Sequence, residues 1–228
     1  MTFDVIERSN QDGLPVALYE FQFGSTVWRY CGDEEDITVG GNVYSALAIQ
    51  DGGIRMTGEP ADDTMSITVD STMPIAVMLN GAPPSDTIWV NIRRHHHGDT
   101  DAPIVWVGYI SSRQQATSKS VTLKCKMLTA GFARDGLRLS YGRQCPHALY
   151  GIDCRVDKEA FAVVVEVENL VGNTVYSDAL TEVASLNNGF FEWSRFSGAI
   201  ERRGIETHSD DHFSILGTSA GLSVGDLI

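Results

Sequence analysis

Residues 120–127 read SVTLKCKM, in which polar and apolar side chains alternate at every position. Successive side chains of a β-strand point to opposite faces of a sheet, so this pattern predicts a strand with one buried and one solvated face. Cys125 falls among the apolar positions, and we therefore expect its thiol to be buried. Residues 64–70, TMSITVD, show the same alternation.

Strand-like runs recur along the rest of the chain, separated by the turn-forming residues Gly, Asn, Asp and Pro. The predicted strands are Val16–Phe23, Thr26–Tyr30, Asn42–Ala48, Met65–Val69, Thr87–Arg93, Ile104–Ile110, Ser120–Met127, Ala162–Glu168, Phe190–Phe196 and Phe213–Leu216. We expect Thr87–Arg93, Ile104–Ser112 and Ser118–Met127 to be antiparallel neighbours, because Gly- and Asp-rich turns separate them.

One short helix is predicted over Met73–Asn80, with Ser71 or Thr72 capping its N-terminus and Pro74 in its first turn. The predicted fold class is mainly β. We expect an N-terminal domain resembling a β-barrel or sandwich over residues 1–140, and a smaller C-terminal β domain over 141–228. A cysteine-containing loop would join the two domains.

Charge and hydropathy exclude several classes of protein. The chain has 228 residues and a net charge of −13, which disfavours binding to nucleic acid or to anionic membrane surfaces. No apolar run approaches the roughly 20 residues of a membrane-spanning helix. Asp4, Glu7 and Arg8 are not typical of a signal peptide, so we expect synthesis in a reducing cytoplasm, where cysteines stay thiols or bind metals.

Residues 143–156, RQCPHALYGIDCRV, contain two of the four cysteines, Cys145 and Cys154. The pair is compatible with a disulfide, a zinc site, a catalytic thiol next to His147, or half of an iron–sulfur cluster. Eight intervening residues are too many for the usual zinc knuckle, whereas iron–sulfur clusters tolerate wider spacings. Catalytic Cys and His residues normally come from distant parts of a chain, and no common catalytic signature is present, so we do not expect an enzyme.

Two polar runs have simpler interpretations than metal binding. Consecutive side chains at His95, His96 and His97 point in opposite directions on a strand, so we expect a strand end that faces solvent or a partner. The acidic run at residues 33–36 lacks the spacing of a calcium loop and is typical of a solvated turn.

The segment CPHALYGIDCRV, which follows VNIRRHHHGD, VWVGYISSR and VTLKCKMLTAGFAR, resembles a family of phage tail-tip hub proteins. This family includes the minor tail protein L type of siphophages and the hub proteins of gene transfer agents. The likeness extends to WRYCGDEEDITVGGNVYSAL and LNNGFFEWSRFSGAIERRGIETH, and so covers nearly the whole chain. It implies a virion protein of the tail tip or baseplate, made in the host bacterial cytoplasm. Such a protein links the distal tail ring to the central baseplate or tail-fibre protein, as a homotrimer in the particle.

The resemblance also implies a cofactor, because some members bind a 4Fe–4S iron–sulfur cluster in the C-terminal domain. Only Cys145 and Cys154 match the family's ligands. Family members usually continue past a strand like LSVGDLI into a tail with two more cysteines, so we expect the other ligands beyond Ile228. In residues 1–228 alone the two sulfurs would be free thiols or oxidised to each other. Cys31 and Cys125 are expected to be buried thiols. The alternatives are a zinc-stabilised β-module of the tail and a cysteine-dependent cell-wall hydrolase.

Overall fold

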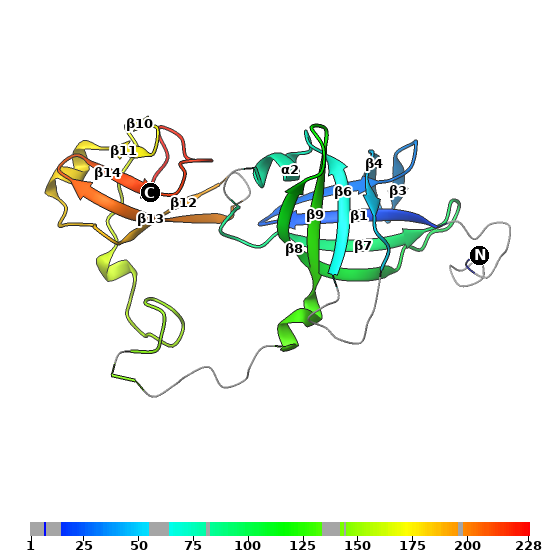
Figure 1. Ribbon diagram of the computed structural model, residues 1–228, viewed down its shortest axis with the longest axis horizontal. Helices are drawn as coiled ribbons and strands as arrows, with labels where there is room; N and C mark the ends of the chain where they lie inside the picture. Colours follow the sequence, from blue (N-terminus) through cyan, green and yellow to red (C-terminus); the bar gives the residue numbers. More distant parts are fainter. Residues whose placement is uncertain are drawn as a thin grey trace. The chain divides into compact units, whose positions relative to one another are not determined.

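The computed structural model describes residues 7, 15–54, 64–80, 83–133, 142–143, 145–195 and 198–228. The chain divides into two compact units, each with its own sheet (Figure 1). Unit 1 comprises Met1–Ala133 and Ser194–Glu201, and unit 2 comprises Arg134–Trp193 and Arg202–Ile228. The boundary predicted near residue 140 lies outside the described residues. The cysteine loop, predicted to join the domains, lies within unit 2.

Unit 1 is built on a nine-stranded mixed sheet with the order β3-β4-β2-β1-β7-β8-β9-β6-β5. Its strands are β1 (Val16–Phe23), β2 (Thr26–Cys31), β3 (Ile37–Val39), β4 (Asn42–Ala46), β5 (Gln50–Asp51), β6 (Thr64–Asp70), β7 (Trp89–His95), β8 (Ile104–Gln115) and β9 (Ser120–Met127). The strands β7, β8 and β9 are consecutive antiparallel neighbours, which confirms the predicted pairing. The pair β2–β4 is parallel.

The sheet of unit 1 curls, so that the edge strand β5 contacts β1 and β7, which lie in the middle of the strand order. Asp51 in β5 accepts a hydrogen bond of 2.8 Å from the hydroxyl of Tyr19 in β1, and Arg94 in β7 lies 3.4 Å from the same carboxylate. Among the described strands, β3 and β5 each have one neighbour, so the sheet is not a closed barrel. The predicted mainly β class is confirmed.

Inward-facing side chains of this sheet form the core of unit 1. Val121, Leu123 and Cys125 are fully buried, as the alternation in β9 predicts. Gly108 in β8 allows the indole of Trp106 to lie across the backbone: a Cβ atom at Gly108 would be 2.3 Å from that ring and 2.2 Å from the carbonyl oxygen of Lys126. Any residue larger than glycine at position 108 would displace the indole or the neighbouring strand.

The predicted helix is present as α2 (Pro74–Met78), but it is shorter than expected and its predicted cap is wrong. The N-cap residue is Met73, and no side chain donates or accepts a capping hydrogen bond. Asp70 instead accepts hydrogen bonds from the backbone N–H and the hydroxyl of Thr72, at 2.8 and 2.6 Å. The hydroxyl of Thr72 donates within this local turn and does not cap the helix.

Unit 2 contains a five-stranded antiparallel sheet with the order β10-β11-β14-β13-β12. Its strands are β10 (Asn169–Val171), β11 (Thr174–Tyr176), β12 (Phe190–Ser194), β13 (Ile200–Ser209) and β14 (His212–Leu216). Among the described residues, one 3-10 helix, Leu128–Ala133, follows β9 in unit 1, and two more, Glu159–Phe161 and Asp178–Glu182, lie in unit 2. The predicted strands at Phe190 and Phe213 correspond to β12 and β14.

The predicted strand Ala162–Glu168 is paired only in its second half. Residues 162–164 belong to no ladder, although their backbone is extended. Only the end of the run is paired: Val165 exchanges two backbone hydrogen bonds with Ile228, at 3.0 and 2.9 Å, and Val167 donates to the carbonyl oxygen of Asp226. A run of valines favours an extended backbone, but a neighbouring strand is needed to make a ladder.

Candidate functional site

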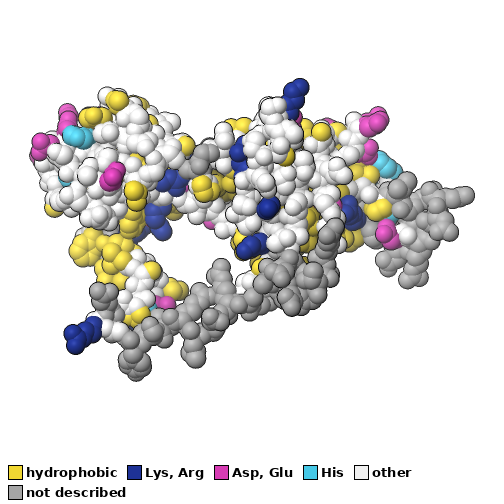
Figure 2. Space-filling model, viewed as in Figure 1, with side chains coloured by type: hydrophobic (Ala, Val, Ile, Leu, Met, Phe, Trp, Pro, Cys, Tyr) yellow, Lys and Arg dark blue, Asp and Glu magenta, His cyan; other side chains and the backbone are white. Residues whose placement is uncertain are grey.

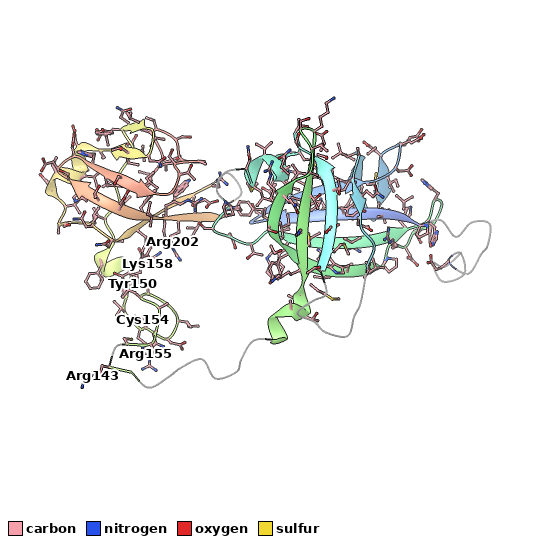
Figure 3. All side chains as sticks on the ribbon, in the orientation of Figure 1. Arg143, Tyr150, Cys154, Arg155, Lys158 and Arg202 are labelled. Atoms are coloured by element: carbon pink, nitrogen blue, oxygen red, sulfur yellow. The ribbon has the colours of Figure 1, made fainter. Side chains whose placement is uncertain are left out.

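The loop that carries the two cysteines contains a pair of tight turns in unit 2, and Cys154 ends the second of them. Gly151 N–H donates to the carbonyl oxygen of Ala148, and Cys154 N–H donates to that of Gly151, both at 2.9 Å. Both cysteines are free thiols; Cys145 is exposed and Cys154 is half-buried. Figure 3 shows Cys154 on this loop, among the side chains of Arg143 and Arg155. The loop therefore presents both sulfurs where solvent or a metal can reach them.

Aromatic contacts attach the loop to the smaller sheet. The ring of Tyr150 lies 6.5 Å from the ring of Phe161 and 5.9 Å from that of Phe190, the first residue of β12. The guanidinium of Arg202 lies over the ring of Phe190, 5.1 Å from its centre. Tyr150 has a positive φ of 60°, a conformation that L-residues rarely adopt, and its aromatic packing helps to hold it.

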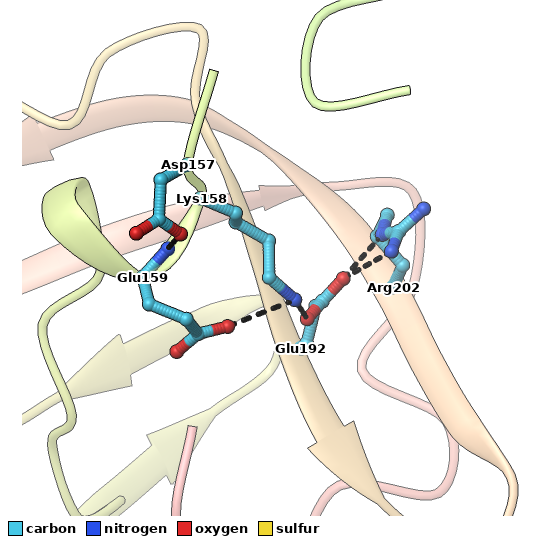
Figure 4. A network of polar contacts seen from close by, with 5 residues as sticks. All are labelled: Asp157, Lys158, Glu159, Glu192 and Arg202. Atoms are coloured by element: carbon cyan, nitrogen blue, oxygen red, sulfur yellow. Dashed lines mark hydrogen bonds and ion pairs between the residues drawn. The ribbon is translucent and has the colours of Figure 1, made fainter. Parts of the chain in front are cut away.

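A network of charges reinforces the same attachment (Figure 4). Lys158 Nζ donates to Glu192 Oε2 at 2.5 Å, and Arg202 Nε donates to Glu192 Oε1 at 2.6 Å. Burial favours the neutral form of Glu192, but the hydrogen bonds from both cations outweigh it and lower the pKa of this carboxyl. The hydrogen bond to Glu192 raises the pKa of Lys158. One carboxylate of β12 thus joins the end of the loop to β13.

The other two cysteines belong to unit 1, and both are buried, as predicted. Cys31 Sγ donates to the carbonyl oxygen of Tyr44 at 3.4 Å. Burial raises the pKa of the Cys125 thiol to about 12. Cys31 and Cys125 belong to different core clusters, and neither has the exposure of a reactive or metal-binding thiol.

The donor set of the loop fits part of a metal site. Cys145 and Cys154 are accessible sulfur ligands of the kind that iron–sulfur clusters and zinc use. Within the described ranges, no three His, Cys, Asp or Glu side chains gather where they could hold a metal ion. The two cysteines therefore fit as half of a four-thiolate set, and the described residues do not supply the other half.

The thiol–imidazole pair needed by a cysteine hydrolase is not assembled. His147 is half-buried and Cys145 is exposed, and no hydrogen bond joins them in the part of the chain that the structure describes. A general base must lie within hydrogen-bond reach of its nucleophile, directly or through one water molecule.

The three consecutive histidines have separate partners. His95 Nδ1 lies 3.2 Å from the carbonyl oxygen of Asp101, His96 Nε2 lies 2.8 Å from Glu7, and His97 Nε2 lies 2.7 Å from Asp33. The rings of His95 and His97 lie edge to face, with their centres 6.5 Å apart.

The expectation that the histidine triplet faces solvent or a partner is wrong for two of its members, which are buried within this chain. His95 and His96 are buried, and only His97 is exposed. Arg94 N–H donates to the carbonyl oxygen of Pro103 at 3.2 Å, so the chain after the turn folds back beside the end of β7. In the acidic run, Asp36 accepts a hydrogen bond from Ala46 N–H at 2.8 Å and so has a structural role in its turn.

Comparison with known proteins shows a shared fold but no sequence family. No family model matches the chain, and no curated protein matches it. A solved chain from the virion of a native gene transfer agent (GTA) particle has the same fold, with a TM-score of 0.75 over 99% of this chain and 82% of that one. The two sequences are 13% identical, so the match shows the fold alone. No helix in the described ranges has the length and apolar character to cross a membrane.

Proposed function

We propose that this protein is a structural component of a phage-like particle, such as a phage virion or a gene transfer agent. The observation that carries the proposal is the fold match, because it includes both units of the chain and leaves 1% of it uncovered. A likeness limited to one sheet would be weaker, since β-sheets of similar shape occur in many unrelated proteins.

The more specific role that we propose is that of a hub at the tail tip, between the distal tail ring and the central baseplate or tail-fibre protein. The sequence resemblance to tail-tip hub proteins supports this role. The net charge of −13 suits complementary contacts with other proteins. Short edge strands such as β3 and β5 need covering in an assembly. In this role three copies surround the tail axis.

Cys145 and Cys154 would hold a 4Fe–4S cluster in that role, together with further ligands that the described residues do not supply. The support is the accessible thiol pair on a loop tied to β12 by Tyr150 and Lys158. The cluster would be structural, since metal ligation stabilises small loop-rich domains with little core. A single zinc ion on the same thiols is the alternative.

Immunogold electron microscopy tests the particle assignment. Cells that produce the particle are given an epitope-tagged copy of the chain, and released particles are purified and labelled. Label at one end of the tail is the expected result. Label that stays in the cell lysate while the particles remain unlabelled would overturn the virion assignment. Label distributed along the tail or on the capsid would overturn the hub role alone.

A further inference from the structure

The loop between Cys145 and Cys154 holds an apolar side chain out in solvent. Ile152 has an exposed fraction of 97%, the highest among the large hydrophobic side chains of the described residues. Tyr150 and Arg155, on either side of it, have positive φ angles of 60° and 58°, which L-residues rarely adopt. Such conformations persist where the surrounding structure holds them, and they are concentrated at functional sites. The exposure of Ile152 therefore belongs to a loop of defined shape.

The base of the same loop borders an apolar cavity of about 410 Å³ in unit 2. Leu149 and Tyr150 line this cavity, whereas Ile152 does not. The rings of Phe161 and Phe190 form other parts of its wall. Unit 2 thus has both an apolar tip and an apolar cavity, and the tip does not fill the cavity of its own chain.

The rim of the cavity exposes more apolar surface. Leu149, Phe161, Val163 and Val164 line the cavity, and their exposed fractions run from 50% to 73%. Figure 2 shows hydrophobic side chains gathered over the segment that precedes the smaller sheet. Contiguous exposed apolar surface of this kind marks a place where another molecule binds.

The charges at this face cancel. Lys158 lies 2.5 Å from Glu192 and 3.7 Å from Glu159, and Arg202 pairs with the same Glu192. These two cations and two carboxylates sum to zero, and they include every Lys, Arg, Asp and Glu among the described residues that line the cavity. The charged side chains described in the adjoining loop, at residues 142–143 and 145–157, also cancel: Arg143, Asp153, Arg155 and Asp157.

A neutral face has a particular consequence in so acidic a protein. The whole chain carries a net charge of −13, so copies of it repel one another overall. At the cavity and its loop the local charge is zero, and two copies can approach there at little electrostatic cost. A strongly charged partner of either sign would gain nothing from this face.

We infer that two copies of this chain meet at this face, with Ile152 of one copy inserted into the apolar cavity of the other. The chain itself supplies both the tip and the cavity, and the neutral face lets like-charged copies come together. The contact is heterologous because tip and cavity are different surfaces, so it repeats from copy to copy and forms a ring if the rotation closes. Only the place of such a ring, around a tail axis, rests on the proposed function.

Sedimentation equilibrium of the whole chain, at concentrations up to about 1 mM, measures this contact. We expect weak association that strengthens at about 0.5 M salt, because salt screens the repulsion between copies and does not weaken an apolar contact. Ile152→Asp and Val164→Asp should each weaken association about tenfold or more, since each brings a carboxylate into the apolar contact. Val43→Asp adds the same charge at an exposed position of β4 in unit 1 and should leave association unchanged.

A mixture of the two variants supplies the second arm. The Ile152→Asp chain keeps an unaltered cavity and the Val164→Asp chain keeps an unaltered Ile152, so the mixture should form heterodimers with about the affinity of the wild-type chain. A mixture that associates no better than either variant alone would overturn the insertion of a tip into a cavity. Wild-type chains that do not associate at about 1 mM, or variants that associate as wild type does, would also overturn it. Labelling of particles does not bear on these results, so this inference and the proposed function can fail separately.

Discussion

The carboxylate of Glu201 is fully buried, and its Oε1 lies 3.1 Å from Nη1 of Arg195 on the same hairpin. Its Oε2 accepts a hydrogen bond of 2.9 Å from the backbone N–H of Ser85. Ala199, between the two charged residues, packs in the core of unit 1. The hairpin end Ser194–Glu201 therefore belongs to unit 1, although most of β12 and β13 belongs to unit 2.

Removing the Glu201 carboxylate should destabilise the packing of the hairpin end in unit 1. Glu201→Ala removes the acceptor of the Ser85 N–H and leaves the largely buried guanidinium of Arg195 without this partner, and we expect a loss of about 3–5 kcal/mol in the free energy of unfolding of unit 1. Hydrogen exchange of unit 1 amides measures this loss.

Two variants serve as controls for this prediction. Glu206→Gln, at an exposed position of β13, should change stability by less than about 0.5 kcal/mol. Replacing Glu201 and Arg195 together by methionine should cost less than Glu201→Ala, because no charge is then left unpaired. If Glu201→Ala behaves like Glu206→Gln, the buried pair does not hold the hairpin end.

Gly108 should tolerate no larger residue. In Gly108→Val the added atoms collide with the Trp106 indole and the Lys126 backbone, and overpacking of a core typically costs about 1–3 kcal/mol or more. Urea unfolding, followed by tryptophan fluorescence, measures the shift in midpoint. Gly131→Ala is the control, because a Cβ there meets no atom within 4 Å. Equal midpoints for the two variants would contradict the close packing of Trp106.

The four cysteines should separate into two reactivity classes in protein that carries no metal. Cys145 and Cys154 should react quickly with a thiol reagent at about pH 8, whereas Cys31 and Cys125 should react only after unfolding, because both are buried. Burial also raises the pKa of Cys125 to about 12, which leaves little thiolate near neutral pH. Mass spectrometry after timed alkylation identifies the modified residues. Fast modification of Cys125 would contradict the described core.

The metal content of the protein tests the cluster. The protein as its host cell makes it, produced with iron under anaerobic conditions, should be brown and contain iron and sulfide. Cys145→Ser and Cys154→Ser should each lose the colour and the order of unit 2 while unit 1 stays folded. Cys125→Ala should keep the colour, because this thiol belongs to the core of unit 1. A colourless protein with one zinc ion per chain would replace the iron–sulfur proposal by its alternative.

The isolated chain should be monomeric or weakly associated. A net charge of −13 makes copies repel one another, so we expect a trimer only around the tail partners. Sedimentation velocity at physiological salt measures the association state. A stable trimer of the chain alone would contradict the dependence on partners.

The sequence alone determined the features that depend on local alternation. The pattern in SVTLKCKM specified β9, the buried face of that strand and the burial of Cys125, because side-chain direction in a strand follows from position parity alone. The bounds of β1 at Val16–Phe23 and the antiparallel neighbours β7, β8 and β9 followed from similar local patterns and the turns between them.

Only the tertiary structure decided which surfaces are covered and which stay open. His95 and His96 are buried because a later segment folds back beside β7, and Ala162–Val164 forms no ladder with any of the described strands. The hairpin end Ser194–Glu201 belongs to unit 1, where Glu201 accepts a hydrogen bond from Ser85 N–H, 116 residues earlier in the chain. Burial and pairing are properties of two segments that meet in space, so the pattern of either segment alone does not contain them.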